Sequence, residues 1–142
     1  MTPIEDLQTR LQEYVRKHGS SIKRVREWQD AVSELCDDVI TWFEPITSAD
    51  LGRVLKSPTT DHCPSIPLTF ETFRLYLRLN NFEEFEFIPV FTREWVEVRV
   101  RDVCQTRIKR VRGKWRVSLQ EGHGDLTEDS LADLLCRIKC RM

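Results

Sequence analysis

The sequence predicts an α+β domain with an N-terminal helical hairpin, a five-stranded antiparallel meander sheet and a C-terminal helix packed on the sheet. Apolar residues first recur at steps of three and four, the spacing of an amphipathic helix. From Leu68 they alternate with polar residues, as in strands that have one buried face, and after Thr127 the helical spacing returns. We therefore expect a single domain over residues 1–142, with a helical part at 2–56, a loop at 57–67, a sheet at 68–119 and a terminal helix at 127–141.

The first helix is expected to begin at a capping box. Thr2 precedes Pro3, which suits the first helical turn, and Glu5 stands where its carboxylate reaches back to the cap. Gly19 is expected to end this helix, because glycine readily adopts the left-handed conformation of a C-cap. The apolar stripe of the helix comprises Ile4, Leu7, Leu11, Val15 and Tyr14.

A second helix is expected to start at Ser20 or Ser21 and to stop before Pro45, since proline disfavours helical geometry in the residue that precedes it. The two helices are expected to form an antiparallel hairpin. Ser48 is expected to cap a short third helix through residue 55, and the prolines between residues 57 and 67 indicate a loop. The apolar positions of the second helix are Ile22, Val25, Trp28, Val32, Leu35, Val39 and Phe43.

The strands are expected in meander order, because short links favour antiparallel pairing of consecutive strands. Turns are expected at Asn80-Asn81 and at Arg112-Gly113. Gly122 and Gly124 are expected to break the sheet before the terminal helix. The predicted strands are 68–79, 82–91, 96–101, 106–111 and 114–119, and the stripe of the terminal helix is Leu131, Leu134, Leu135 and Ile138.

The composition is that of an ordinary globular chain. The 142 residues include 22 Lys and Arg and 23 Asp and Glu, so the formal net charge is −1 and gives no argument for a nucleic-acid partner. With 40% apolar residues interspersed among charges, disorder is not expected. No apolar run is long enough for a membrane span, and the N-terminus lacks the layout of a signal peptide, so we expect a cytoplasmic protein without membrane contact.

The five cysteines do not form a recognisable framework. Their number is odd and no C-x-x-C occurs, so neither disulfides nor a metal site is expected. The nearest approach to a metal half-site is Cys136 with Cys140 on the terminal helix, which would need further ligands such as His62 and Cys63. Cys136 and Cys140 are expected to project away from the core side of that helix.

The inventory of catalytic residues is thin. The histidines are far apart in sequence, and no nucleophile elbow, Gly-rich phosphate loop or metalloprotease motif occurs. Asp61-His62-Cys63 is the most reactive triplet, because an imidazolium activates a nearby thiolate, but adjacent side chains seldom meet in that way. We therefore expect no enzymatic activity and no cofactor.

Basic residues gather on the last predicted hairpin. A basic face there could lie along phosphates, with an affinity that falls as salt rises. In the competing interpretation, glutamates on the neighbouring strands pair with these cations across the sheet. The candidate nucleic-acid-binding residues are Arg107, Lys109, Arg110, Arg112, Lys114 and Arg116.

Aromatic residues on the polar face of the sheet are the candidates for protein binding. Trp95 shares the phase of Glu97, and Tyr76 shares the phase of Arg78, so both rings stand on the wet face unless a helix covers it. Trp, Tyr and Arg are the residues that dominate binding hot spots. The candidate partner-binding residues are Tyr76, Trp95, Arg99 and Arg101.

The leading expectation is a non-enzymatic protein-binding module of the immunity, inhibitor, chaperone or accessory-factor type, whose partner is another protein. A homodimer is among the assemblies considered. One alternative is a nucleic-acid-binding accessory protein that uses the hairpin 107–116. Another is a small-molecule-binding or enzymatic pocket between sheet and helices, with His62, Cys63 or His123 at its mouth. The layout is common among small bacterial-type proteins, and no motif identifies a family.

Overall fold

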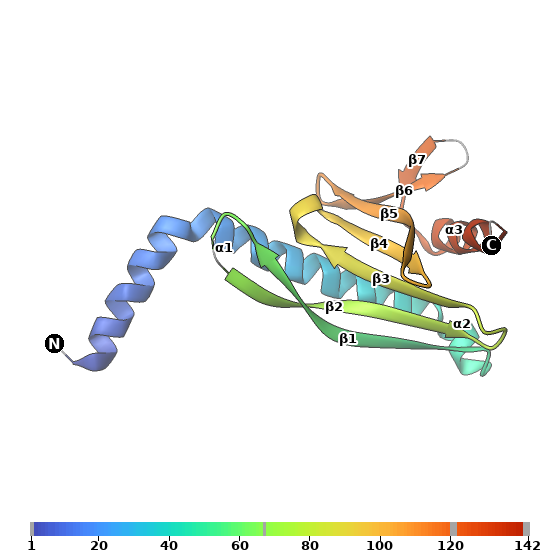
Figure 1. Ribbon diagram of the computed structural model, residues 1–142, viewed down its shortest axis with the longest axis horizontal. Helices are drawn as coiled ribbons and strands as arrows, with labels where there is room; N and C mark the ends of the chain where they lie inside the picture. Colours follow the sequence, from blue (N-terminus) through green and yellow to red (C-terminus); the bar gives the residue numbers. More distant parts are fainter. Residues whose placement is uncertain (1, 67, 120–121, 141–142) are drawn as a thin grey trace.

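A computed structural model describes residues 2–66, 68–119 and 122–140, apart from the side chains of residues 119, 139 and 140. One long helix lies along one face of an antiparallel sheet and projects beyond it at its N-terminal end (Figure 1). The elements are α1 (Pro3–Trp42), α2 (Glu44–Ser48), β1 (Gly52–Cys63), β2 (Leu68–Leu79), β3 (Glu84–Val90), the 3-10 helix η1 (Phe91–Arg93), β4 (Trp95–Val100), β5 (Val103–Val111), β6 (Lys114–Leu119), β7 (Gly122–Asp125) and α3 (Glu128–Cys140).

The predicted helical hairpin is wrong, because α1 runs as one helix from Pro3 to Trp42. The chain bends at His18, whose φ of −119° and ψ of 15° are not helical, but it does not reverse at Gly19. A glycine inside a helix costs only about 1 kcal/mol, so packing of the residues that follow it outweighs its tendency to end the helix. The predicted start is confirmed by the Thr2 capping box, and the helix stops before Pro45 as predicted.

The predicted short helix from Ser48 and the loop 57–67 are also wrong. The short helix, α2, ends at Ser48, and residues 52–63 form β1, which pairs with β2 over its whole length from Gly52↔Leu79 to Cys63↔Leu68. β1 is an edge strand, the place in a sheet where a proline such as Pro58 is tolerated because one row of amides needs no partner. The proline content that indicated a loop marks a sheet edge instead.

The antiparallel meander is confirmed, with seven strands among the described residues instead of five, in the order β1 to β7. The two strands beyond the predicted five are β1 and β7. β7 is formed by the Gly122–Asp125 segment, which was expected to break the sheet. It pairs with β6 from Arg116↔Asp125 to Leu119↔Gly122. Its side chains are mostly exposed, so its sequence lacks the alternation of apolar and polar residues that predicts a strand. Thr127 caps α3 as predicted, since its hydroxyl oxygen accepts the Ser130 amide at 3.2 Å.

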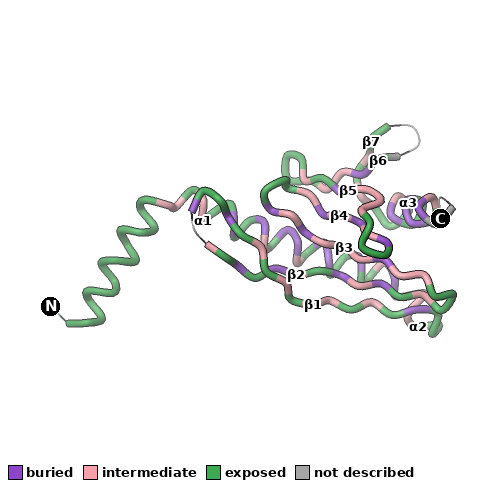
Figure 2. Tube along the Cα trace, in the orientation of Figure 1, coloured by how far each residue is buried: buried purple, intermediate pink, exposed green. Residues whose placement is uncertain are grey.

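The core lies between α1 and the sheet. The alternation predicted for the strands is confirmed: Leu75, Phe85, Phe87 and Val98 are at most 3% exposed and face the helix. The buried residues of α3, which packs on β6, belong to the same cluster. Beyond Val25 the buried residues of α1 recur along the helix, whereas its N-terminal portion is exposed throughout (Figure 2). Among the described residues, no helix combines the length and hydropathy needed to cross a bilayer.

Candidate functional site

The N-terminal arm, residues 3–17 of α1, carries the most conspicuous apolar surface among the described residues. Figure 2 shows this segment exposed along its length and directed away from the sheet. At 3.6 residues per turn its large apolar side chains fall within an arc of roughly 100°. The exposed fractions are 69% for Ile4, 49% for Leu7, 55% for Leu11, 41% for Tyr14 and 53% for Val15.

The arm is a well-formed helix although no described strand or helix covers its apolar stripe. The Glu5 amide donates to the Thr2 hydroxyl at 3.2 Å, and the Thr2 amide donates to the Glu5 carboxylate at 3.5 Å. An ion pair of 3.3 Å joins Asp6 to Arg10 one turn later. At the bend, the ring centroid of Tyr14 lies 4.7 Å from that of His18, the irregular residue. The apolar stripe is therefore presented on a helix that is already ordered.

The base of the arm is fastened to the sheet where the bend occurs. The Ser21 and Ser65 hydroxyls lie 3.0 Å apart, and Ser65 in turn lies 3.1 Å from the Cys63 sulfur. Ser65 belongs to the turn between β1 and β2, the end of the longest strand pair in the sheet. The sheet thus ends level with Ser21, and residues before it have no strand to pack on.

Three of the four predicted partner-binding residues lie on the outer face of the sheet, the face turned away from α1. Tyr76, Glu86 and Arg99 form one row across β2, β3 and β4. The pKa of Tyr76 is raised, chiefly because its hydroxyl bonds to the Glu84 carboxylate. Arg99 donates to Glu97 at 3.0 Å. Arg99 therefore pairs with a glutamate of its own strand, and not across the sheet as the competing interpretation of the basic cluster expected.

Trp95 stands on the same face, two rows away from Tyr76, and is half-buried. The guanidinium of Arg107 lies 4.6 Å from its ring centroid and that of Arg93 5.9 Å, so both contact its aromatic surface. Its indole N–H is buried without a hydrogen-bond partner among the described residues. Arg101, the last predicted residue, lies apart in the turn after β4 with a φ of 52°. The structure therefore brings Tyr76 and Arg99 together and leaves Trp95 and Arg101 separate.

The basic hairpin of β5 and β6 divides its cations between two faces. Arg107 and Lys109 are exposed on the outer face, and the Lys109↔Arg116 register places Arg116 beside them. Arg116 pairs with Asp125 at 2.7 Å. Arg110 points to the other face, where its guanidinium lies 4.9 Å from the Trp115 ring centroid. Within the described residues, no ion pair engages Arg107, Lys109, Arg110, Arg112 or Lys114.

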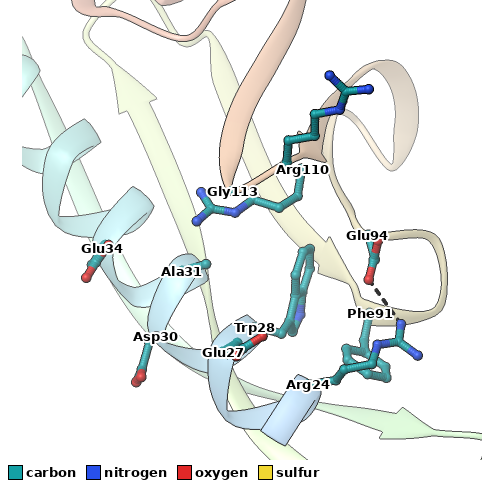
Figure 3. A pocket seen from close by; sticks show the side chains of 11 residues that line it. Arg24, Glu27, Trp28, Asp30, Ala31, Glu34, Phe91, Glu94, Arg110 and Gly113 are labelled. Carbon is teal, nitrogen blue, oxygen red and sulfur yellow. Dashed lines mark hydrogen bonds and ion pairs between the residues drawn. The ribbon is translucent and has the colours of Figure 1, made fainter. Parts of the chain in front are cut away.

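An open cleft of about 490 Å³ separates α1 from this hairpin. Figure 3 shows Glu27 and Glu34 on the helix side, Arg110 on the hairpin side and Trp28 between them. The 3.0 Å ion pair of Arg24 with Glu94 lies at one end. A second cleft of about 420 Å³ shares Glu34, Arg110 and Gly113 with the first. His62, Cys63 and His123 line neither cleft, so the predicted mouth residues do not meet a cavity here.

The Asp61-His62-Cys63 triplet does not form a nucleophile with its base. These residues are consecutive on β1, where neighbouring side chains point to opposite faces; His62 is exposed and Cys63 is buried. Asp61 accepts the amides of His62 at 2.8 Å and Phe91 at 2.7 Å, so it anchors η1. Burial raises the pKa of the Cys63 thiol, but hydrogen bonds with Ser65 and the Ile66 backbone, together with the charge of Arg24, outweigh it and the net pKa is lowered.

The remaining thiols and the interior offer little chemistry. Cys36, Cys63, Cys104 and Cys136 are free thiols, Cys136 is exposed as predicted, and the Cys140 side chain lies outside the described residues. Within the described part of the chain, no group of three or more His, Cys, Asp or Glu side chains is placed to hold a metal ion. A cavity of about 10 Å³ between α1 and the sheet has an apolar lining and holds at most one water.

In comparisons with known proteins, no family model matches the chain, and neither the curated proteins nor the solved structures gave a significant match. A function is therefore inferred from the structure alone. Sequence reasoning placed the residues of the arm on one stripe but did not foresee that the stripe is uncovered. The available signal for one continuous helix was the phase of the apolar residues, which is kept across Gly19 because Ile22 lies seven residues, about two turns, after Val15.

Proposed function

We propose that this chain is a non-enzymatic protein-binding module whose N-terminal arm pairs with an amphipathic helix of its partner. The observation that carries the proposal is the row of large apolar side chains on the arm, each between 41% and 69% exposed. Exposed apolar patches of this kind, bordered by polar residues, are typical of protein interaction sites. A helix with such a stripe is most readily covered by a second helix with a matching stripe.

The N-terminal cap of the arm supports binding by a helix that is already formed, and not by a disordered tail that folds on binding. The Thr2 capping box and the continuity with the packed half of α1 hold the arm in a helical conformation before a partner arrives. Binding therefore costs little conformational entropy, which favours recognition by a rigid helical face. The arm also stands away from the sheet, so a partner helix reaches its stripe without displacing any element of the domain (Figure 1).

Site-specific photo-crosslinking in cells tests the proposal. A photoreactive side chain replaces Leu11 in the middle of the stripe, and the matched control replaces Thr9, which is exposed on the opposite side of the same helix. We expect a crosslinked product from position 11 whose partner peptide, mapped by mass spectrometry, is an amphipathic helical segment. Equal crosslinking from both positions, or none from position 11, contradicts the proposal.

The basic hairpin supports a second candidate function, nucleic-acid binding. Its supporting observation is that Arg107, Lys109 and Lys114 are exposed without ion-pair partners among the described residues. Such cations can contact successive phosphates. In a binding titration with single-stranded and duplex oligonucleotides, this function predicts an affinity that falls steeply with salt and is weakened by Lys109→Glu. An affinity independent of salt, or unchanged in that variant, counts against it.

The prediction that Tyr76, Trp95, Arg99 and Arg101 bind a partner stays a prediction. Arg99 is already paired with Glu97, and Tyr76 with Glu84, so a partner at this face would have to replace existing hydrogen bonds. Trp95 is the more suitable anchor, since its ring is only half-buried and its side chain makes no hydrogen bond among the described residues that a partner would have to replace. Trp95→Ala removes the ring; we expect it to weaken partner binding only if the sheet face takes part.

A further inference from the structure

We propose that the outer face of the sheet binds single-stranded nucleic acid, with an unpaired base stacked on the guanidinium of Arg107 and phosphates held by the cations beside it. This inference rests on the second candidate function, because it names the form of nucleic acid and the residues that contact it. It starts from a stack of two side chains: the Arg107 guanidinium lies 4.6 Å from the centroid of the Trp95 ring. Trp95 is half-buried and Arg107 is exposed, so the ring covers one side of the guanidinium while Arg107 stays open to solvent.

Three cations around the Trp95 ring have no carboxylate partner. Arg93 lies 5.9 Å from the ring centroid, and Lys109 stands opposite Trp95 in the β4–β5 register. Arg93, Arg107 and Lys109 are all exposed, and no ion pair engages them within the described residues. Two residues along a strand span roughly 7 Å, which matches the rise of two nucleotides in a stacked strand. Arg107 and Lys109 are therefore spaced to contact phosphates of one strand.

The acids that border these cations are bound to other residues. Glu97 stands opposite Arg107 in the β4–β5 register, but its carboxylate lies 3.0 Å from the Arg99 guanidinium. The bordering charges cancel in pairs, so the surplus of positive charge stays at the Trp95 ring. The three pairs are Glu94 with Arg24 at 3.0 Å, Glu97 with Arg99 at 3.0 Å and Asp125 with Arg116 at 2.7 Å.

The same hairpin carries a second stack of arginine on tryptophan, on its other face. The Arg110 guanidinium lies 4.9 Å from the Trp115 ring centroid. Arg110 lines the cleft opposite Glu27 and Glu34 of α1 (Figure 3). These carboxylates repel a phosphate group, whereas no helix with acidic residues faces Arg107 across a cleft among the described residues. Charge thus selects the outer stack for an anionic ligand.

An unpaired base fits the outer stack better than a duplex or an acidic polypeptide does. Nucleobases stack on guanidinium planes as well as on aromatic rings. The Trp95 ring holds the Arg107 guanidinium in place, so binding orders fewer side-chain torsions. In a duplex the faces of the bases are stacked on each other, and an acidic polypeptide supplies carboxylates without a flat base. DNA and RNA single strands share the chemistry that this site recognises.

Fluorescence anisotropy with labelled oligonucleotides of about 15 nucleotides tests the inference. The probes are single-stranded DNA, single-stranded RNA and a DNA duplex, and unlabelled poly-glutamate serves as the acidic competitor. We expect a single strand, of DNA or RNA, to bind about tenfold more tightly than the duplex and to resist poly-glutamate. A plot of the logarithm of its affinity against the logarithm of salt concentration should have a slope of roughly −2, as three phosphate contacts imply.

Arg107→Lys separates stacking from charge. It keeps the positive charge and removes the guanidinium plane, so it should weaken single-strand binding about tenfold without changing the salt slope. The matched control is Arg110→Lys, the same change in the stack on the cleft face, which should leave the affinity unchanged. Lys109→Gln should instead make the salt slope shallower by about 0.7, the share of one phosphate contact. Circular dichroism confirms that all three variants are folded.

Four results overturn the inference: a duplex that binds as tightly as either single strand, displacement by poly-glutamate as readily as by unlabelled oligonucleotide, an unchanged affinity in Arg107→Lys, or equal losses in Arg107→Lys and Arg110→Lys. The first, third and fourth leave the second candidate function standing, because the hairpin still binds nucleic acid in a salt-dependent manner. Absence of binding to every oligonucleotide ends both. The pairing of the arm with a partner helix is independent of all these outcomes, since crosslinking at position 11 tests it.

Discussion

The two halves of α1 share one sequence pattern, but the apolar residues of one half are buried and those of the other are exposed. In the packed half, residues 20–42, Val25, Trp28, Val32, Leu35 and Val39 follow the three-and-four spacing and are at most 4% exposed. In the arm, Ile4, Leu7, Leu11 and Val15 follow the same spacing and are at least 49% exposed. Amphipathic spacing therefore tells which face of a helix needs covering, and leaves open whether the same chain supplies the cover.

The extent of the sheet accounts for the difference. β1 and β2 form the longest strand pair, and their turn contacts α1 at Ser21, where the Ser65 hydroxyl lies 3.0 Å away. Ile66 in this turn is 1% exposed and joins the core. The helix continues beyond this point, but the sheet does not. We infer that the packed half of α1 stabilises the fold and that the arm serves an interaction outside it.

The largest effect that separates the two halves should come from matched Leu→Ala substitutions. Leu35→Ala leaves a cavity between α1 and the sheet, since Leu35 is 4% exposed, and should lower the free energy of unfolding by about 2–5 kcal/mol. Leu11→Ala removes a side chain that is 55% exposed and should change it by less than about 0.5 kcal/mol. Urea denaturation measures both losses.

Equal losses of stability in Leu11→Ala and Leu35→Ala would contradict this difference between the arm and the packed half of α1. Such a result would mean that the arm folds back onto the domain in solution. Hydrogen exchange on the two variants then identifies the covered surface, because amides that Leu11→Ala deprotects report where the arm packs.

The second effect concerns pH and the thiol in the packed half. Burial raises the pKa of Cys36 to about 11 from an ordinary value of 9.0, and the nearby Lys56 only partly opposes this. The folded state thus holds its proton more tightly, so this contribution to stability is complete below about pH 9 and is lost as the pH rises from about 9 to about 11. Two pKa units correspond to roughly 3 kcal/mol at most.

Urea denaturation between pH 8 and pH 10.5 checks this expectation. The loss of stability with rising pH should be smaller in Cys36→Ala than in the unaltered chain. The matched control is Leu11→Cys, whose thiol is on the exposed arm and ionises in both folded and unfolded states. It should follow the pH dependence of the unaltered chain. A Cys36→Ala profile parallel to that of the unaltered chain would show that the buried thiol does not contribute.

Much of the fold follows from local pattern. Alternation predicted five strands from Leu68 onward because each has one face in the core, as Phe85 and Phe87 illustrate. It failed for β1 and β7, the two edges, where fewer side chains are buried and Pro58 or glycine is tolerated. It also failed at Gly19, since the low cost of one glycine is outweighed by the packing of residues 20–42.

The candidate site was less predictable, for a different physical reason. The outward phase of Tyr76 and Trp95 follows from alternation within a strand and needs no knowledge of the rest of the molecule. The exposure of Leu11 depends on where the sheet ends, and therefore on pairings between residues far apart in sequence. The cleft between α1 and Arg110 likewise arises from the placement of a helix against a hairpin, which no local pattern specifies.

A smaller effect should come from the ion pairs of the two halves. Lys56 connects β1 to the packed half: its ammonium lies 3.0 Å from Asp37 and 3.0 Å from the Ser33 hydroxyl, and 4.4 Å from the Phe73 ring centroid. Lys56→Met keeps the aliphatic stem and removes these contacts, which should cost about 1 kcal/mol. Asp6→Asn removes only the exposed pair with Arg10 and should cost less than about 0.5 kcal/mol. Urea denaturation in low salt compares the two, and equal losses would contradict the assignment of Lys56 to the cooperative core.

The smallest effect on global stability should come from the cap of the arm. Thr2→Ala removes the acceptor of the Glu5 amide and, with it, about 1 kcal/mol of helix stability in the first turns. Because the arm makes no contact with the core, this loss should appear as faster amide exchange over residues 5–9, while the midpoint of urea denaturation stays unchanged. Thr41→Ala in the packed half is the control, since it removes a hydroxyl bond to the Asp37 carbonyl without touching the cap. If Thr2→Ala shifted the global midpoint by its full 1 kcal/mol, the arm would belong to the same cooperative unit as the packed half.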